Sequence, residues 1–172
     1  MRKKNILLKA NGDQYDTINF MKKYSILFAK HPFYKKFITQ NNLTGTKEDL
    51  KKIFNYVFYN TYYKKDPNGR QQIRSGTRLL KDKFGNCVDY SVIFSSFLLN
   101  LGIPHSMRMI ATKGSKPEDF SHIYVVTDNG LVMDAVIGQD QDGKEYLKSK
   151  TQRTPFFNTQ ANYINKYDLK VL

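Results

Sequence analysis

One short stretch organises this chain, and it reads Gly85-Asn86-Cys87-Val88-Asp89-Tyr90-Ser91. From Val88 to Leu101 the apolar residues recur at helical spacing, which predicts a helix. Gly102 stands where a left-handed C-cap is expected, and a proline follows two residues later. The stretch therefore places the only cysteine of the chain at or near the first turn of a helix. The expected buried face of that helix carries Tyr90, Phe94, Phe97, Leu98 and Leu101.

The position of Cys87 has chemical meaning. A helix N-terminus offers unpaired backbone N–H groups and the positive end of the helix dipole. Both stabilise a thiolate, which makes a cysteine at that place a better nucleophile. The alternative is a structural cysteine that only packs, since free cysteine is among the most buried residue types. Residues further along the chain favour the nucleophile.

Two runs rich in β-branched and aromatic residues, 120–126 and 131–136, predict neighbouring strands. The first contains His122 and the second contains Asp134. An aspartate inside an apolar strand is unusual unless it has a polar partner. We therefore ask whether the hairpin brings Asp134 within reach of His122.

The length of the hairpin loop decides this question. A two-residue loop would place Asp134 opposite Val125, with His122 on the other side of the sheet. A three-residue loop, Asp128-Asn129-Gly130 with its glycine left-handed, pairs Asp134 with Tyr124 instead. Asp134 and His122 then share one face as diagonal neighbours. Together with Cys87 they offer a nucleophile, a base and an orienting acid.

At these residues the sequence resembles the transglutaminase-like superfamily, which has a papain-like core. The resemblance rests on the Gly-Asn-Cys start of the helix, its exit Leu101-Gly102-Ile103-Pro104, and the strand containing Ser121-His122-Ile123-Tyr124-Val125. It extends over about Asp49 to Val136, and its upstream part is similar to the bacterial and phage branch. The upstream motifs lie at residues 63–67, 71–75 and 79–84.

The resemblance implies a site and a function. Cys87 would be the nucleophile, His122 the base and Asp134 the acid of a transglutaminase-like cysteine peptidase, amidase or acyltransferase. The partner would be a peptide or amide substrate. The backbone N–H of Cys87 would meet the oxyanion, together with a side-chain donor that the sequence does not identify. Asn86 departs from the family pattern, in which many members carry aspartate there.

The expected fold class is α+β: a helix bearing Cys87 packs on an antiparallel sheet of at least three strands, with two or three helices before it. The length of 172 residues suits a single transglutaminase-like domain. We divide it into an N-terminal helical extension (1–45), a core (46–137) and a C-terminal extension (138–172). Helices are expected over 13–30, from 46 to about 63 and over 77–83. A strand is expected over 105–112, and a strand or a helix near the end of the chain.

Two other functions remain open. One is a structural component, such as a phage virion protein, that uses the fold as a scaffold with little or no turnover. The other is a module that binds an anionic polymer, such as nucleic acid, through its lysines, because the net charge is +13 from 28 basic and 15 acidic residues. No nucleic-acid motif accompanies this charge, which favours a solvated lysine surface instead.

Composition sets further limits. The single cysteine rules out an internal disulfide. With three separated histidines, no metal-ligand spacing exists, so neither a metal nor a cofactor is expected. His105, at a strand start, is not expected to be catalytic. The basic start Met1-Arg2-Lys3-Lys4 precedes no signal-peptide core, and no apolar run could span a membrane. The expected location is the cytoplasm, or a virion if the protein is phage-encoded.

Overall fold

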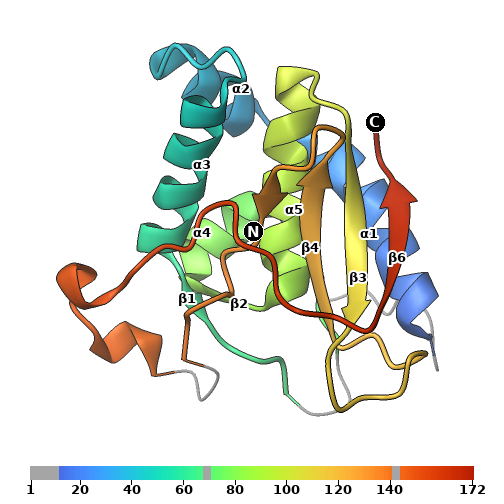
Figure 1. Cartoon of the computed structure of the whole chain (residues 1–172). Helices are drawn as coiled ribbons and strands as arrows, with labels where there is room; N and C mark the ends of the chain where they lie inside the picture. Colours follow the sequence, from blue (N-terminus) through green and yellow to red (C-terminus); the bar gives the residue numbers. More distant parts are fainter. Residues whose placement is uncertain (1–11, 68–70, 141–143) are drawn as a thin grey trace.

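The structure, a computed structural model, describes residues 12–67, 71–140 and 144–172. Its helices lie on one side of an antiparallel sheet (Figure 1). Within the described ranges the α-helices are α1 (Gln14–Ala29), α2 (Pro32–Gln40), α3 (Lys47–Asn60), α4 (Gly76–Asp82) and α5 (Cys87–Leu101). The expected α+β class is confirmed, although four α-helices of the described residues, rather than the expected two or three, precede the helix that begins at Cys87.

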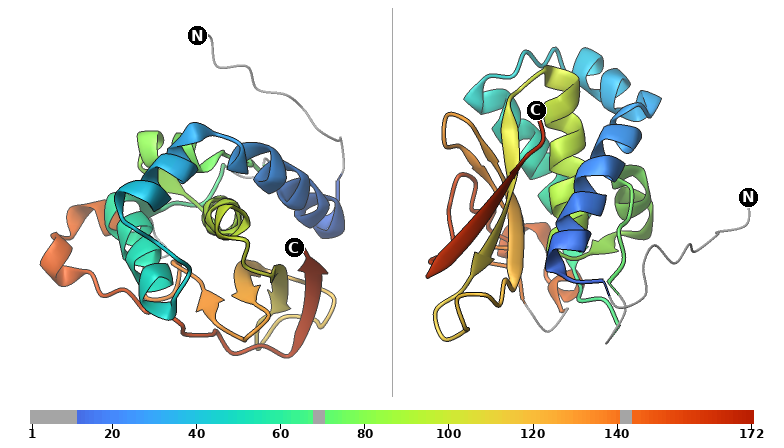
Figure 2. Two further views of the ribbon diagram at one scale, coloured as in Figure 1. Left: turned by 90° about the horizontal axis from the view of Figure 1, so that it is seen from above. Right: turned by 90° about the vertical axis from the view of Figure 1, so that its right-hand side faces the viewer.

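The sheet has four strands in the order β5-β4-β3-β6, all antiparallel to their neighbours. They are β3 (His105–Ala111), β4 (His122–Thr127), β5 (Val132–Met133) and β6 (Asn165–Lys170). Seen from above, α5 is surrounded by α1, α3 and this sheet (Figure 2). A separate parallel pair joins β1 (Tyr62–Tyr63) to β2 (Phe84–Gly85), directly before the cysteine.

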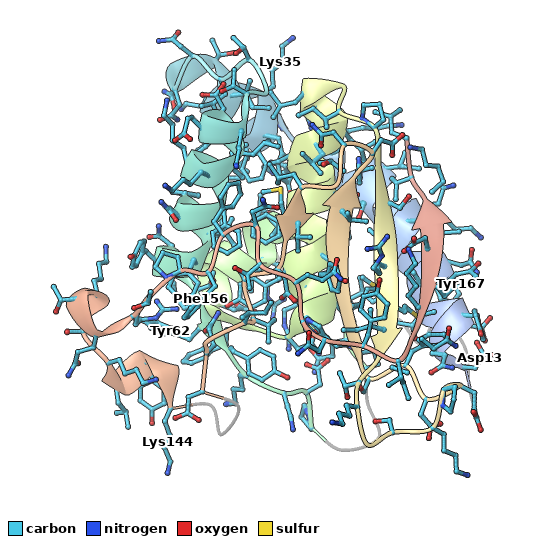
Figure 3. The ribbon with its side chains drawn as sticks, viewed as in Figure 1. Asp13, Lys35, Tyr62, Lys144, Phe156 and Tyr167 are labelled. Carbon is cyan, nitrogen blue, oxygen red and sulfur yellow. The ribbon has the colours of Figure 1, made fainter. Side chains whose placement is uncertain are left out.

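The C-terminal segment folds back across the molecule and ends in the sheet. Two short 3-10 helices, η1 (Glu145–Leu147) and η2 (Lys150–Gln152), lie outside the core (Figure 1). The guanidinium carbon of Arg153 then lies over two aromatic rings, 4.5 Å from the ring centroid of Phe58 and 4.7 Å from that of Tyr62. Tyr62 and Phe156 are labelled in Figure 3. The chain finally forms β6 beside β3, so the open choice between a strand and a helix is settled as a strand.

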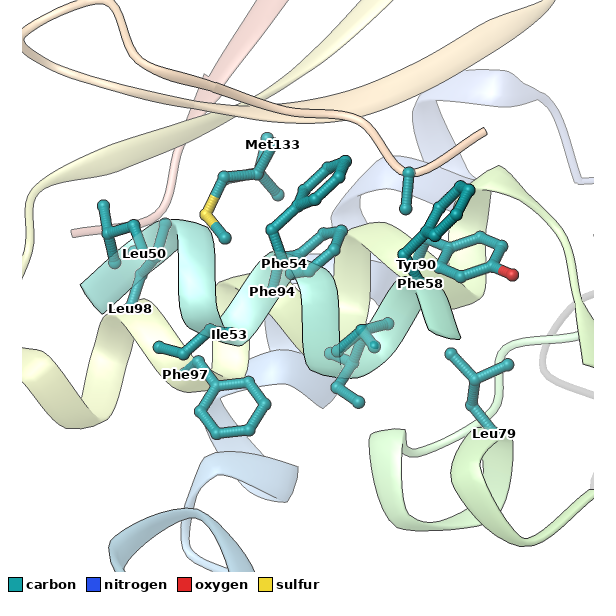
Figure 4. Packing of buried hydrophobic residues seen from close by; sticks show 14 of the residues in the cluster. Leu50, Ile53, Phe54, Phe58, Leu79, Tyr90, Phe94, Phe97, Leu98 and Met133 are labelled. Atoms are coloured by element: carbon teal, nitrogen blue, oxygen red, sulfur yellow. The ribbon is translucent and has the colours of Figure 1, made fainter. Parts of the chain in front are cut away.

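Helix α5 is the centre of the core, and its burial differs from the expectation of a single buried face. Every residue from Val88 to Leu98 is buried. One side packs aromatic and aliphatic residues against α3, where Phe94 stacks on Phe54 with ring centroids 5.6 Å apart (Figure 4). The other side, with Val88, packs against α1 and β3. A helix that is buried on all sides is a core helix rather than an amphipathic surface helix.

The predicted helix starts are confirmed by their caps. Asp13 caps α1 and Thr46 caps α3, each through a reciprocal capping box. Helix α3 ends at Asn60, earlier than the expected end near Tyr63, because the residues that follow pair with β2. Helix α5 ends at Leu101, and its C-cap Gly102 is left-handed with φ of +67°.

No helix within residues 12–67, 71–140 and 144–172 is long and apolar enough to cross a membrane. The expectation about the basic start of the chain, Met1 to Lys4, concerns residues outside the described ranges.

Candidate active site

The β4–β5 hairpin has the predicted three-residue loop. Val126 pairs with Val132, and the N–H of Thr127 donates to the carbonyl of Leu131 at 2.9 Å. Gly130 closes the turn with φ of +83°, a conformation that a residue with a side chain rarely adopts. The predicted register of the two strands is therefore confirmed. This register places His122 and Asp134 on the same face of the sheet.

His122 and Asp134 form a direct hydrogen bond, with Nε2 of the histidine 2.5 Å from Oδ2 of the aspartate. Asp134 is 2% exposed, and its Oδ1 accepts a second hydrogen bond from the backbone N–H of Val136 at 3.1 Å. Because Asp134 occupies Nε2, the other ring nitrogen of His122 is left for Cys87. The three residues singled out from the sequence thus lie at one place.

The pKa of His122 reflects both neighbours. Burial alone would lower it, but the hydrogen bond and negative charge of Asp134, together with a hydrogen bond to Cys87, outweigh burial and raise the pKa to about 10. The site therefore places a cationic imidazole beside the sulfur of Cys87 at neutral pH.

Cys87 is the first residue of α5, as the sequence predicts, and it is partly buried. Asn86 is the N-cap, and its side-chain oxygen accepts from the N–H groups of Val88 at 3.0 Å and Asp89 at 3.4 Å. The N–H of Cys87 itself donates to no group among the described residues. It remains a donor at a helix N-terminus, where negative charge is stabilised.

Ser91 fixes the first turn of α5 against β4. Its hydroxyl bridges two carbonyl oxygens, that of Cys87 at 2.8 Å and that of Ile123 at 3.2 Å. Since Ile123 is the neighbour of His122, this hydroxyl links the helix that carries Cys87 to the strand that carries His122.

A buried ion pair supports the same turn from the other side. Asp89 is fully buried, and its carboxylate accepts from the Arg74 guanidinium at 2.5 Å, the Arg74 backbone N–H at 2.8 Å and the Asn86 backbone N–H at 3.1 Å. Burial raises the pKa of Asp89 to about 6, and the positive charge of Arg74 opposes that rise. The pair ties residues upstream of α4 to the start of α5.

Asp66 is the hydrogen-bond partner of the side-chain amide of Asn86. Its carboxylate accepts from the side-chain amide of Asn86 at 2.9 Å and from the guanidinium of Arg74 at 3.0 Å. Asn86 therefore donates to Asp66 and accepts from the helix at the same time. An aspartate at position 86 would face Asp66 with a second negative charge.

Gly85 allows these groups to approach. A Cβ on this glycine would lie 2.5 Å from Leu79 Cδ1 and 2.9 Å from Asp89 Oδ2, which leaves no room for a side chain. Its carbonyl accepts from the N–H of Lys64 at 2.8 Å, which extends the β1–β2 pair to the residue before the cap.

The other two histidines have structural partners. His105 is buried and bonds Ser95 through Nε2 and the carbonyl of Ile103 through Nδ1, both at 2.8 Å. His31 caps α2 by accepting from the N–H of Phe33. Of the three histidines, His122 is the one that lines the cavity with Cys87.

A cavity of about 120 Å³ lies directly beside Cys87 and His122. Its walls include Gln14, Thr17 and Met21 of α1, a helix to which the sequence assigned no part of the site. The other members that sequence reasoning missed are Arg74, Asp66 and Ser91. Asp89 left one signal, because it is the only charged residue in a helix that is mostly apolar.

A larger, open hollow of about 410 Å³ lies on the outer face of the sheet, away from α5. Arg108 and Asp168 cross it with a two-pronged ion pair at 2.6 Å and 2.8 Å. None of its lining residues is a cysteine or a histidine.

Two solved structures resemble this one. A protein from Parabacteroides distasonis described as a "putative protease" superposes with a TM-score of 0.52 at 13% identity, over 65% of this chain and 24% of that one. A "putative cysteine protease" from Cytophaga hutchinsonii gives a TM-score of 0.44 at 16% identity, over 93% of this chain and 56% of that one. The chain thus spans less than two thirds of either protein. The first likeness supports the fold.

No curated protein matches the sequence. The model of one protein family does match, over residues 33–140, which begins in α2 and includes α5, β3, β4 and β5. This range covers more than half of the chain and contains Cys87, His122 and Asp134. The chain belongs to the transglutaminase-like superfamily.

Proposed function

We propose that this protein catalyses cysteine-dependent acyl transfer or hydrolysis at an amide, with Cys87, His122 and Asp134 as its triad. The observation that carries the proposal is the placement of His122 between a buried carboxylate at 2.5 Å and the sulfur of Cys87. Cysteine nucleophiles need a base within hydrogen-bond reach, held in turn by a third group.

The chemistry follows from the positions of the protons. The thiolate of Cys87 attacks the carbonyl carbon of the amide, and a new carbon–sulfur bond forms. The imidazolium of His122 gives its proton to the leaving nitrogen, so the carbon–nitrogen bond breaks and an amine departs. The neutral imidazole then takes a proton from water or from an acceptor amine, which attacks the thioester and releases Cys87. Asp134 keeps the ring in place and stabilises its charged form.

The tetrahedral intermediate carries a negative oxygen that needs hydrogen-bond donors. The N–H of Cys87 at the start of α5, which donates to no group in the described part of the chain, supplies one donor. Because the side chain of Asn86 caps the next two N–H groups, this donor stays available for the substrate.

Acylation of Cys87 is the direct test. The folded protein is incubated with a library of activated esters and amides, and its intact mass is measured over time. We expect an acyl adduct that maps to Cys87, that is absent in Cys87→Ala, and that forms at least 100-fold more slowly in His122→Ala. A folded protein that takes up no acyl group from any member of the library would overturn the proposal.

A further inference from the structure

The cavity beside Cys87 is closed on one side by α1. Gln14, Thr17 and Met21 lie on successive turns of that helix and all line the cavity. Helix α1 ends at Ala29, before the family match begins at residue 33. This wall of the site therefore comes from a part of the chain outside the matched segment.

Helix α1 is held at both ends, so the wall is fixed. Near its C-terminus, the side-chain amide of Asn100 donates to the carbonyl of Ala29 at 2.9 Å, and the hydroxyl of Ser96, which donates to the carbonyl of Val92 at 2.8 Å, also lies 3.3 Å from the carbonyl of Ser25. At its N-terminus, the side-chain amide of Gln14 donates to the carbonyl of Glu118 at 2.7 Å. Both α5 and the β3–β4 connection thus anchor the helix.

Aromatic packing adds to this anchorage. The ring of Tyr15 meets Phe120 edge-on at 6.1 Å and Tyr167 edge-on at 5.1 Å. Phe120 also lines the cavity, so the contact joins α1, the β3–β4 connection and β6 around one side of the site.

The lining is uncharged except at the catalytic pair. Among the described residues around the cavity, the side chains other than Cys87 and His122 are apolar or neutral, without Lys, Arg, Asp or Glu. A charged group entering it would lose part of its hydration without gaining a partner of opposite charge, since the charge of His122 is already matched by Asp134. The apolar members are Met21, Val88, Met109, Phe120 and Ile123.

The volume limits what can enter. A dry cavity of about 150 Å³ accepts benzene, a molecule of six carbon atoms. At about 120 Å³, this cavity is smaller. The cavity is open to solvent on one side, so it can cover an aliphatic or carboxamide side chain of about four heavy atoms, whereas part of an aromatic ring would stay outside it.

We propose that this cavity receives the side chain of the acyl group that Cys87 carries, and that α1 restricts it to small, uncharged side chains. This inference rests on the proposed function and names its class of substrate. Thr17 is the specificity-determining residue most open to test, because it is only partly buried and its side chain faces the cavity.

The experiment measures single-turnover acylation of Cys87 in the full chain, by intact mass, with N-acetylated amino-acid thioesters that differ only in side chain. Alanine and norvaline should react at least 10-fold faster than phenylalanine, lysine or glutamate. Thr17→Leu fills the cavity and should lower the norvaline-to-alanine ratio about tenfold. Thr17→Ala enlarges it and should raise the relative rate of phenylalanine. Leu27→Ala, on the exposed face of the same helix at 55% exposure, is the matched control and should keep the wild-type ratios.

The outcomes separate the two proposals. Acylation of Cys87 with equal rates for all side chains, or with ratios that neither Thr17 variant changes, overturns the inference and leaves the proposed function standing. No acylation by any thioester, in protein shown to be folded by circular dichroism, overturns both.

Discussion

His122 Nε2 lies 2.5 Å from Asp134 Oδ2 across a three-residue hairpin loop, and Asp134 is almost completely buried. A buried carboxylate this close should hold the imidazole in its charged form well above neutral pH. Because the pKa of His122 is raised to about 10, the effect of Asp134 on the imidazole can be measured by titration.

The first prediction concerns the titration of His122. In NMR spectra of imidazole-labelled protein, the His122 ring should stay cationic through pH 8. His105 provides an internal control, because burial lowers its pKa and its ring should be neutral there. In Asp134→Asn the carboxylate charge is lost, burial is opposed only by the contact with Cys87, and the pKa of His122 should fall well below its wild-type value. A wild-type His122 that loses its proton below pH 7 would contradict the assignment.

The same shift has a consequence for stability. The pKa of His122 is higher in the folded protein than in the unfolded chain, so folding favours its proton. This contribution to the free energy of unfolding is fully present below about pH 6.5 and is lost as the pH rises towards 10. Urea denaturation at pH 6.5, 8 and 9.5 should show the decline in the wild type and a flatter profile in Asp134→Asn.

The second prediction concerns the reactivity of Cys87. Iodoacetamide should alkylate it faster at pH 6 than it alkylates glutathione, because an imidazolium and a helix N-terminus both favour the thiolate. His122→Ala should slow alkylation at least tenfold. Asp134→Asn should reduce turnover more than alkylation, since its main role is to hold the ring during proton transfer. Equal rates for the wild type and His122→Ala would instead support a scaffold without catalysis.

The sequence was sufficient where the determining signal was local. The three-residue loop with Gly130 determined the register, and through it the meeting of His122 with Asp134. Capping residues such as Thr46 marked the helix starts for the same reason. In these cases the deciding residues lie within a few positions of one another.

The parts that could not be predicted depend on distant segments. The partner of Asp89 is Arg74, 15 residues earlier, in a loop without periodic pattern. The wall formed by α1 depends on contacts such as that between Ser25 and Ser96, 71 positions apart. Helix α5 was expected to bury one face, and it is buried all round because α1 and β3 cover the side that the prediction left to solvent.

The third prediction tests why position 86 is an asparagine. Asn86→Asp should lower the free energy of unfolding by about 2 kcal/mol, because a donated hydrogen bond to Asp66 becomes a contact between two carboxylates. Adding Asp66→Asn should restore part of the loss. A double-mutant cycle by urea denaturation measures the coupling, which we expect at about 1–2 kcal/mol. Additive losses in the cycle would show that the two side chains do not interact.

The last prediction compares two arginines that form ion pairs of different burial. Arg74→Met leaves the fully buried carboxylate of Asp89 without its guanidinium and should cost about 3 kcal/mol at pH 8. Arg78→Met breaks a more exposed pair with Asp82, four residues along α4, and should cost about 0.5 kcal/mol or less. Thermal and urea denaturation of both variants give the two costs.

Acid should reduce the cost of Arg74→Met. In the wild type, burial raises the pKa of Asp89 to about 6 while Arg74 holds it down, so losing Arg74 lets the pKa rise further. The folded variant then keeps its proton to higher pH, and a neutral carboxyl group needs no cation beside it. The difference in the free energy of unfolding between wild type and Arg74→Met should therefore shrink from pH 8 to pH 5. Because Asp89 also holds the N–H of Asn86, the variant should alkylate Cys87 more slowly as well. Equal costs for Arg74→Met and Arg78→Met, unchanged between pH 5 and pH 8, would show that the buried pair does not support the helix start that carries Cys87.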